Sequence, residues 1–328
     1  MASKADEGTD GALPLYRRFP RLTRIPRVAL GAFPTPVQPL ASIAPGMWIK
    51  RDDLCAEPLG GNKARALEFL LARVQPGDRV VTVGAAGSTH ALAVATYAAR
   101  LGATAEVARW RQVMNPMASR VAARMPAFAE LAPVFHTVAG AYAWAWMRRL
   151  RGATWIPAGG STPLGILGHV NAGLELVDQL RAGELPMPQS VVLPLGTGGT
   201  MAGLVLAFAI AHVPIRVVGA RVVPTIVGRL GRVQRLASAT ARLIERTSGA
   251  RVPRPSPPAM AIDDRYYGGA YGRETIDARD AAAAMRAANG VVLDSTYSAK
   301  AFALARARAN RETVLFWLTF DSRTLSTR

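Results

Sequence analysis

SVVLPLGTGGTMAGLVLAFA, residues 190–209, places a buried strand, a glycine turn and an apolar helix in immediate succession. The β-branched run SVVLPL predicts the strand, and MAGLVLAFAIAH predicts the helix. From Leu185 to Ile215 there is no Asp, Glu, Lys or Arg, a length that could cross a bilayer. Pro194, the glycine cluster and Pro214 interrupt this stretch, so we expect a buried βα unit and no membrane span.

The same alternation of strand and helix runs through most of the chain on both sides of this segment. We expect strands at 47–53, 78–84, 103–110, 133–138, 154–160, 190–195, 291–294 and 314–320. We expect helices at 64–74, 88–102, 118–132, 141–152, 164–183, 201–212, 227–250, 276–290 and 295–311. This order predicts an α/β protein whose mostly parallel sheet is covered by helices on both faces.

Composition excludes several classes of protein. A chain of 328 residues with 50% apolar and 19% charged residues can bury a large core, so it is not disordered, coiled-coil or collagen-like. The net charge of +18 would suit a nucleic-acid or anionic-membrane partner, but the charge is scattered. Its densest stretch, Arg17 to Arg27, lacks the interleaved aromatics that stack on bases. We therefore expect no nucleic-acid partner; the opposite view predicts strongly salt-dependent retention on DNA.

The single cysteine, Cys55, cannot form an internal disulfide, and the N-terminal MASKADEGTDGALP has no apolar segment of the kind a secretory signal needs. We therefore expect a reducing, cytoplasmic location. The four histidines and the one cysteine show no metal-ligand spacing, so we expect no metal.

GTGGT, residues 196–200, is a candidate phosphate site. It lies between a strand and a helix, where backbone N–H groups and the positive helix end converge on a phosphate. The spacing is neither GxGxxG nor that of a P-loop, so neither a dinucleotide site nor a P-loop is predicted. A plain glycine turn that closes a buried βα unit is the alternative interpretation.

Lys63 is a candidate for covalent chemistry, because it stands at the start of the predicted helix in GGNKARALEFL, residues 60–70. The helix dipole acts on it as a like charge, which lowers the pKa of the amine and favours the neutral form that makes a Schiff base. Most lysines at helix starts have no such role, so an ordinary lysine is the alternative.

Hydroxyl groups form two further candidate sites. Ser88, Thr89 and His90 open a helix in GAAGSTHALAVA, residues 84–95, and could bind a carboxylate; an ordinary N-cap by Ser88 or Thr89 is the alternative. Phenols can relay protons where a cation or a helix end lowers their pKa, although most tyrosines simply pack. The candidates are Tyr266, Tyr267, Tyr271 and Tyr297.

Taken together, eight segments in order resemble the pyridoxal-phosphate enzymes of the tryptophan-synthase β fold, and among them the 1-aminocyclopropane-1-carboxylate deaminase and D-cysteine desulfhydrase family. The resemblance extends from about Phe33 to Thr319, and several motifs in register are far more specific than any one of them. The segments are FPTPVQPL, IKRDDL, GGNKARALEFLLA, VTVGAAGSTHALAVA, IPAGGSTPLGILGHVNAGLEL, LGTGGTMAGL, YGGAYG and VLDSTYSAKA.

The resemblance implies two open, mostly parallel twisted sheets flanked by helices, with pyridoxal 5'-phosphate in the cleft between two domains. We also expect a smaller α/β domain at 58–171 and a larger domain made of 14–57 and 172–328. The polar composition of residues 1–13 predicts a flexible tail. The resemblance also implies a homodimer that acts on a small amino acid.

Site roles follow from the same resemblance. Lys63 would hold the cofactor covalently, and Lys63, Ser88, Tyr271 and Tyr297 would be catalytic. Ser88, Thr89, His90, Gly160 and Ser161 would bind the substrate. The other cofactor contacts would be Asn62, Thr89, Gly196, Thr197, Gly198, Gly199, Thr200, Ser298 and Thr319.

Two positions bear on the reaction. In the deaminases that this chain resembles, the segment at the late tyrosine looks like TYEGK, whereas the desulfhydrases carry hydroxyl residues at two distinguishing positions. Here Ser298 and Thr319 occupy those two positions. A neutral hydroxyl near the pyridine nitrogen would leave that nitrogen largely unprotonated, which makes the cofactor a weaker electron sink. Elimination of a good leaving group such as sulfide needs less stabilisation of the carbanion than opening a cyclopropane. The sequence therefore predicts a D-cysteine desulfhydrase-like lyase that forms pyruvate, ammonia and sulfide. The alternatives are a 1-aminocyclopropane-1-carboxylate deaminase and a cofactor-binding, weakly active or inactive relative with a regulatory role.

The chain departs from the family at two places. Gly87 and Thr89 replace a glutamine and an asparagine around the cleft serine, and LTFD, residues 318–321, replaces HTGG. Phe320 could fill the space beside the cofactor ring. We expect Asp321 to be solvated; an approach of its carboxylate to the pyridine nitrogen is the alternative.

Overall fold

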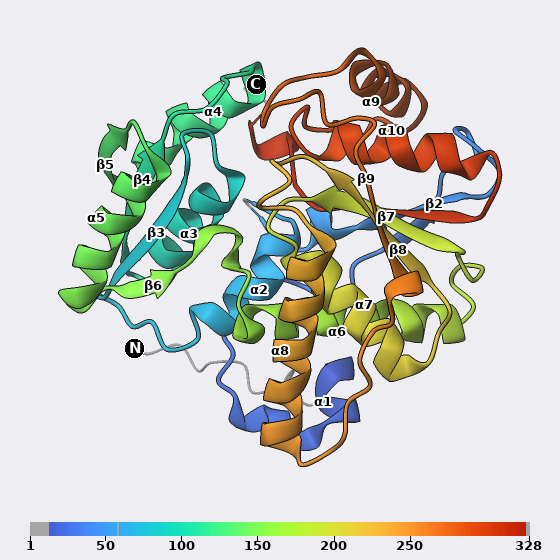
Figure 1. Ribbon diagram of the computed structural model, residues 1–328, viewed down its shortest axis with the longest axis horizontal. Helices are drawn as coiled ribbons and strands as arrows, with labels where there is room; N and C mark the ends of the chain where they lie inside the picture. Colours follow the sequence, from blue (N-terminus) through green and yellow to red (C-terminus); the bar gives the residue numbers. More distant parts are fainter. Residues whose placement is uncertain (1–12, 58, 326–328) are drawn as a thin grey trace.

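The computed structural model describes residues 13–57 and 59–325. Most of the expected tail, residues 1–12, lies outside the described residues, and Leu13 is buried in the core next to α1 (Pro14–Arg18). Two sheets organise the rest (Figure 1), which confirms the predicted α/β fold. None of the described helices is both long and apolar enough to cross a bilayer.

The larger sheet has six strands in the order β1-β2-β10-β7-β8-β9. All neighbours pair in parallel except β1 and β2. The bounds are Val37–Pro39 (β1), Met47–Arg51 (β2), Val314–Leu318 (β10), Ser190–Leu195 (β7), Arg216–Arg221 (β8) and Met260–Asp263 (β9).

Helices cover both faces of this sheet (Figure 1). One face packs against α6 (Pro163–Arg181), α7 (Gly199–Ala211) and α8 (Leu230–Ser248) in a single apolar cluster. The other packs against α9 (Ile276–Asn289) and α10 (Ser298–Ala309). Because both faces are covered, the central strands are apolar throughout rather than alternating, as β10 shows by its five buried residues.

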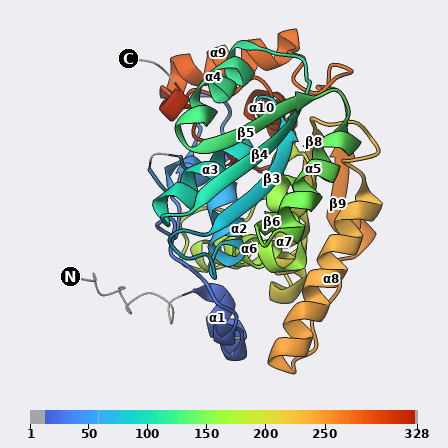
Figure 2. The same cartoon turned by 90° about the vertical axis from the view of Figure 1, so that its left-hand side faces the viewer.

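The smaller sheet has four parallel strands in the order β5-β4-β3-β6 (Figure 2). The bounds are Ala129–Phe135 (β5), Thr104–Trp110 (β4), Arg79–Ala85 (β3) and Thr154–Ile156 (β6). One apolar cluster joins this sheet to α2 (Asn62–Leu70), α3 (Thr89–Arg100) and α4 (Pro116–Arg124), and another joins it to α5 (Val138–Leu150).

Several expectations about elements differ from the structure. The expected strand at 291–294 is absent: Asp294 accepts the N–H groups of Tyr297 and Ser298 in a turn before α10, and Leu293 packs against an apolar cluster without joining the sheet. The helix expected at 118–132 ends at Arg124, because Pro126 cannot continue it, and β5 starts earlier than expected, at Ala129. Strands β1, β8 and β9 were not expected at all.

The expected boundary between the two domains at residues 171 and 172 falls inside α6. Ile166, Leu167 and Val170 precede that boundary and pack in the apolar cluster of the six-stranded sheet. The division into 58–171 and the remainder stays a proposal.

Candidate active site

A pocket of about 760 Å³ lies between the two sheets, at the carboxyl ends of their strands. Ala85 and Trp110 end strands of the smaller sheet, Leu195 ends one of the larger sheet, and all three line the pocket. Open α/β sheets bind ligands at this edge. Every site residue implied by the resemblance lines the pocket except Gly160 and Ser298, which are buried and adjoin lining residues in the chain. Of the four candidate phenols, Tyr271 and Tyr297 line the pocket, whereas Tyr266 and Tyr267 do not.

Lys63 lies in the first turn of α2, two residues after the N-cap Gly61. Gly61 has a φ of +130°, which only glycine adopts readily. Burial lowers the pKa of Lys63 to about 8. The chain contains only four lysines. Of the three that the structure describes, Lys50 pairs with Glu175 and Lys300 donates to the carbonyl of Tyr267, whereas Lys63 lines the pocket.

The glycine loop at 196–200 leads into α7, and its backbone is open to the pocket. Gly198 is the N-cap, with a φ of +87° and no capping side chain, so the first N–H groups of the helix remain free for an anion. A Cβ added at Gly196 would meet no heavy atom within 4 Å. The Asn62 amide donates to the Thr200 hydroxyl at 2.7 Å, and the hydroxyls of Ser161 and Thr197 are 2.6 Å apart, which ties the loop to α2 and to the turn before α6.

Ser88, Thr89 and His90 open α3 at the pocket wall. Ser88 caps the helix by accepting the N–H of Ala91 at 3.2 Å, so the N-cap interpretation is confirmed for this residue. The positive end of α3 therefore faces the pocket. Burial, together with the charge of Lys63, lowers the pKa of His90 to about 3, so its imidazole is neutral.

Tyr271 and Tyr297 come from separate loops, and their hydroxyls share a hydrogen bond. Burial raises the pKa of Tyr297 to about 12 and that of Tyr271 well above its ordinary value. Both phenols therefore keep their protons at neutral pH, the opposite of the lowered pKa that a proton-accepting role would need. Asn115 holds the two loops together, since its amide donates to the carbonyl of Gly272 at 2.8 Å and to the hydroxyl of Thr296 at 2.9 Å.

The segment that departs from the family motif closes one side of the pocket. Thr319 and Phe320 both line it, and Phe320 also packs in the apolar cluster of the smaller sheet. Asp321 was expected to be solvated, but it is 1% exposed and pairs with Arg323 at 2.9 Å. The expectation was wrong because an arginine two residues away compensates the buried carboxylate.

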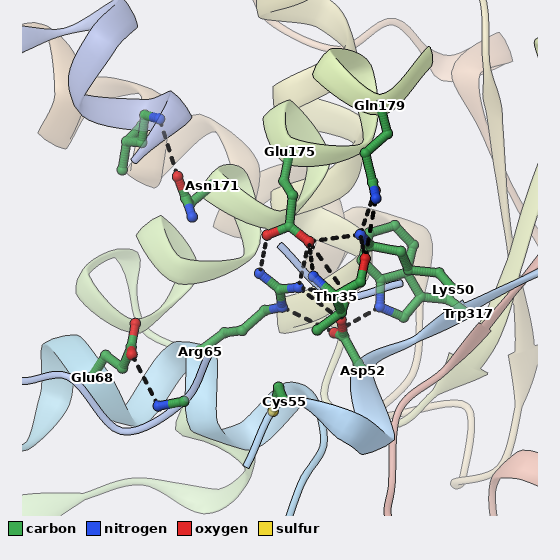
Figure 3. A network of polar contacts seen from close by, with 12 residues as sticks. Thr35, Lys50, Asp52, Cys55, Arg65, Glu68, Asn171, Glu175, Gln179 and Trp317 are labelled. Atoms are coloured by element: carbon green, nitrogen blue, oxygen red, sulfur yellow. Dashed lines mark hydrogen bonds and ion pairs between the residues drawn. The ribbon is translucent and has the colours of Figure 1, made fainter. Parts of the chain in front are cut away.

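Beside Lys63 lies a buried network of charges that the sequence did not indicate (Figure 3). Arg65 forms hydrogen bonds of 2.7 to 3.0 Å with both oxygens of Asp52 and both oxygens of Glu175. Lys50 bonds to Glu175 at 2.6 Å, and the Trp317 indole donates to Asp52 at 2.8 Å. The two cations balance the two carboxylates, and together they tie α2 to β2, α6 and β10. A glutamate inside the apolar α6 and a lysine inside the apolar β2 were the only signals in the sequence.

The model of the pyridoxal-phosphate dependent enzyme family matches residues 28–319, so the chain belongs to that family. A putative 1-aminocyclopropane-1-carboxylate deaminase of Pyrococcus horikoshii is 34% identical and covers 91% of this chain and 92% of its own. The nocardicin C-9' epimerase of Nocardia uniformis is 33% identical over 91% of this chain and 94% of its own, and a D-cysteine desulfhydrase of Salmonella paratyphi A is 30% identical over 89% of each. The crystal structure of a 1-aminocyclopropane-1-carboxylate deaminase homologue matches with a TM-score of 0.78 at 29% identity, covering 93% of this chain and 94% of that one.

The pocket fits the cofactor of this family. The free N–H groups of the loop at 196–200 suit a phosphate, and the space beside Gly196 would receive one. Lys63, with its lowered pKa, offers the amine. When bound, pyridoxal phosphate would supply an electron sink for the negative charge that develops at the substrate Cα. The described residues contain no group of three or more His, Cys, Asp or Glu that could hold a metal ion.

Proposed function

We propose that this protein is a pyridoxal-phosphate-dependent carbon–sulfur lyase that eliminates the β-thiol of a small amino acid, as a D-cysteine desulfhydrase does. One observation carries the proposal: among the described residues that line the pocket there is no aspartate or glutamate. A carboxylate beside the pyridine nitrogen would favour its protonation and strengthen the electron sink, whereas Thr319 offers only a hydroxyl. This pocket therefore suits a reaction with a good leaving group, such as sulfide, better than the opening of a cyclopropane.

The acid and base roles follow from the two opposite pKa shifts. Lys63, with a pKa near 8, is about one-tenth neutral at pH 7, far more than an ordinary lysine, and is the base for the Cα proton. The tyrosine pair stays protonated, and we assign it the transfer of a proton to the leaving sulfur. Ser88 and the N-terminal end of α3 would hold the substrate carboxylate.

The test combines cofactor binding with product analysis. Purified protein with pyridoxal phosphate should show a visible absorbance band, and borohydride should fix the cofactor to the peptide that contains Lys63. Lys63→Ala should lose the band. D-cysteine should then yield pyruvate and sulfide.

The other outcomes separate the alternatives. A four-carbon keto acid from 1-aminocyclopropane-1-carboxylate, without pyruvate from D-cysteine, would indicate the deaminase. Exchange of the Cα proton without release of any keto acid would indicate an epimerase-like activity, and a cofactor band without reaction would indicate an inactive relative. No band, or a normal band in Lys63→Ala, would overturn the assignment of the site. The homodimer and the cytoplasmic location stay predictions, and light scattering tests the first.

A further inference from the structure

The pocket continues past the residues assigned to the cofactor and the reacting atoms. Ser88, Thr89 and Thr319 are each at most 7% exposed, whereas Val138 is 48% exposed and Ile226 is 77% exposed, yet all of them line the same pocket. The exposed residues therefore mark its mouth. Its volume of about 760 Å³ lies in the upper part of the ~300–1,000 Å³ range of pockets that enclose drug-sized ligands. A cofactor with a three-carbon amino acid leaves the outer part unused.

One wall of this outer part is a fixed aromatic cluster. The rings of Trp110 and Tyr142 are stacked, with centroids 6.3 Å apart and an angle of 21° between their planes. Trp155 contacts Tyr142 edge-on at 5.9 Å from the side of β6. Trp110 ends β4 and Tyr142 lies in the first turns of α5, so two elements of the smaller sheet hold the wall in place. A further ring could stack on such a wall at little cost in conformational entropy.

Every charged side chain that lines the described pocket is a cation. Arg111 and Arg232 line the pocket, and neither forms an ion pair with a carboxylate of the described residues. Arg232 is held in place by a hydrogen bond of 2.9 Å from its Nε to the carbonyl of Thr197. Since no carboxylate lines the described pocket, a cationic side chain would meet like charges and find no ion-pair partner. The arginines would attract an anionic side chain, and the aromatic wall would accept a neutral one.

We propose that the outer part of the pocket, bounded by Trp110, Val138, Tyr142 and Ile226, binds an aromatic side chain of the amino-acid substrate, neutral or anionic but not cationic. The proposal rests on the proposed function, because it places the amino and carboxylate groups of the substrate at Lys63 and Ser88. For the proposed elimination it names S-aryl derivatives of cysteine as the substrate class. The Cβ–S bond breaks and the thiol takes a proton. One water is consumed, so the products are the aryl thiol, pyruvate and ammonium.

Binding is measured without turnover, through the visible absorbance of the cofactor in the holoenzyme. The ligands are phenylalanine and alanine, each as both enantiomers, because neither carries a β-leaving group. We expect the Kd of the preferred enantiomer of phenylalanine to be at least tenfold below that of alanine. A carboxyl group at the 4-position of the ring should bind more tightly than an aminomethyl group at the same place. Arg111→Gln should reduce that difference.

Variants on one helix separate the aromatic wall from general effects on α5. Tyr142→Ala should bring the Kd of phenylalanine to within threefold of that of alanine, and Tyr142→Phe, which keeps the ring, should retain the preference. Trp146→Ala is the matched control, because Trp146 is 52% exposed one turn further along α5 and does not line the pocket. It should leave both constants unchanged.

Equal constants for phenylalanine and alanine, or a preference that survives Tyr142→Ala, would overturn the inference while leaving the lyase proposal intact. Absence of the cofactor band would overturn the lyase proposal instead. Calorimetric titration of the same amino acids would then still decide whether the pocket prefers an aromatic side chain.

Discussion

Lys63 and the tyrosine pair lie in one pocket, and burial shifts their pKa values in opposite directions. Burial penalises whichever form is charged, so it favours a neutral amine and neutral phenols. The same desolvation thus prepares a base and an acid without any carboxylate in the described lining. Two groups whose environments move their pKa values apart are a common basis for acid and base roles.

Replacing Tyr297 by Phe tests the acid. The variant keeps the ring but loses the hydroxyl that bonds to Tyr271. We expect turnover of D-cysteine to fall by roughly 10²- to 10⁴-fold, the usual contribution of a positioned acid, while the cofactor band stays. Tyr266→Phe is the control, since Tyr266 packs against an apolar cluster outside the pocket. Turnover within threefold of the parent in Tyr297→Phe would remove the tyrosine from the mechanism.

At single residues, the sequence predicted positions better than environments. The motifs indicated Lys63, the loop at 196–200 and both tyrosines, and the pocket brings them together. The direction of the tyrosine pKa shifts and the burial of Asp321 were beyond the sequence, because both depend on contacts between distant segments. The hydrogen bond from the Asn115 amide, at the start of α4, to the carbonyl of Gly272 could not be predicted for the same reason.

Helix α2 carries Lys63, and the charge network fixes its first turns. Arg65 lies two residues after Lys63 and is 1% exposed, and it contacts carboxylates from the segment after β2 and from α6. The guanidinium also lies 4.1 Å from the ring centroid of Phe33. Such a network couples the position of the reactive amine to both the larger sheet and its covering helix.

Arg65→Met is expected to destabilise the protein strongly, because it leaves Asp52 and Glu175 buried with only Lys50 to balance them. Breaking a buried pair from one side costs roughly 3–5 kcal/mol. Arg254→Met is the control, since Arg254 pairs with Glu245 at the surface, where the two side chains are 38% and 30% exposed and about 0–1 kcal/mol is at stake. Urea unfolding of the two variants measures the difference, and equal losses would contradict the role of the network.

Helices and strands with a clear hydrophobic pattern could be predicted from the sequence, whereas those defined by tertiary contacts could not. The apolar run of β7 and the long helix α6 match their expected positions closely. β9 is a four-residue edge strand with little β-branched content, and its pairing with β8 defines it more than its own sequence does. The run VVLD at 291–294 has strand propensity, but the turn at Asp294 takes it out of the sheet.

At the scale of the whole molecule, two buried histidines, His90 and His169, lie where the two sheets and their helices meet, and both imidazoles are neutral. His169 is 2% exposed on α6, in a place where α7 approaches so closely that a Cβ at Gly203 would lie 2.3 Å from that of His169. Burial, and next the charges of Lys63 and Arg65, lower the pKa of His169 well below its ordinary value. His90 shares this shift. At mildly acidic pH these two histidines therefore bind protons in the unfolded chain but not in the folded state.

This difference makes stability depend on pH in a stated direction. Below about pH 6.5 the unfolded state binds a proton at His169 and the folded state does not, so the free energy of unfolding falls as pH falls, by about 1.4 kcal/mol per pH unit for each such histidine. In urea unfolding between pH 6 and pH 5, His169→Gln should lower the slope of stability against pH by about that amount. His136→Gln, at an exposed position, should leave the slope unchanged. If the slopes of parent and His169→Gln coincide, then His169 must become protonated within the folded protein, and the buried neutral imidazole is excluded.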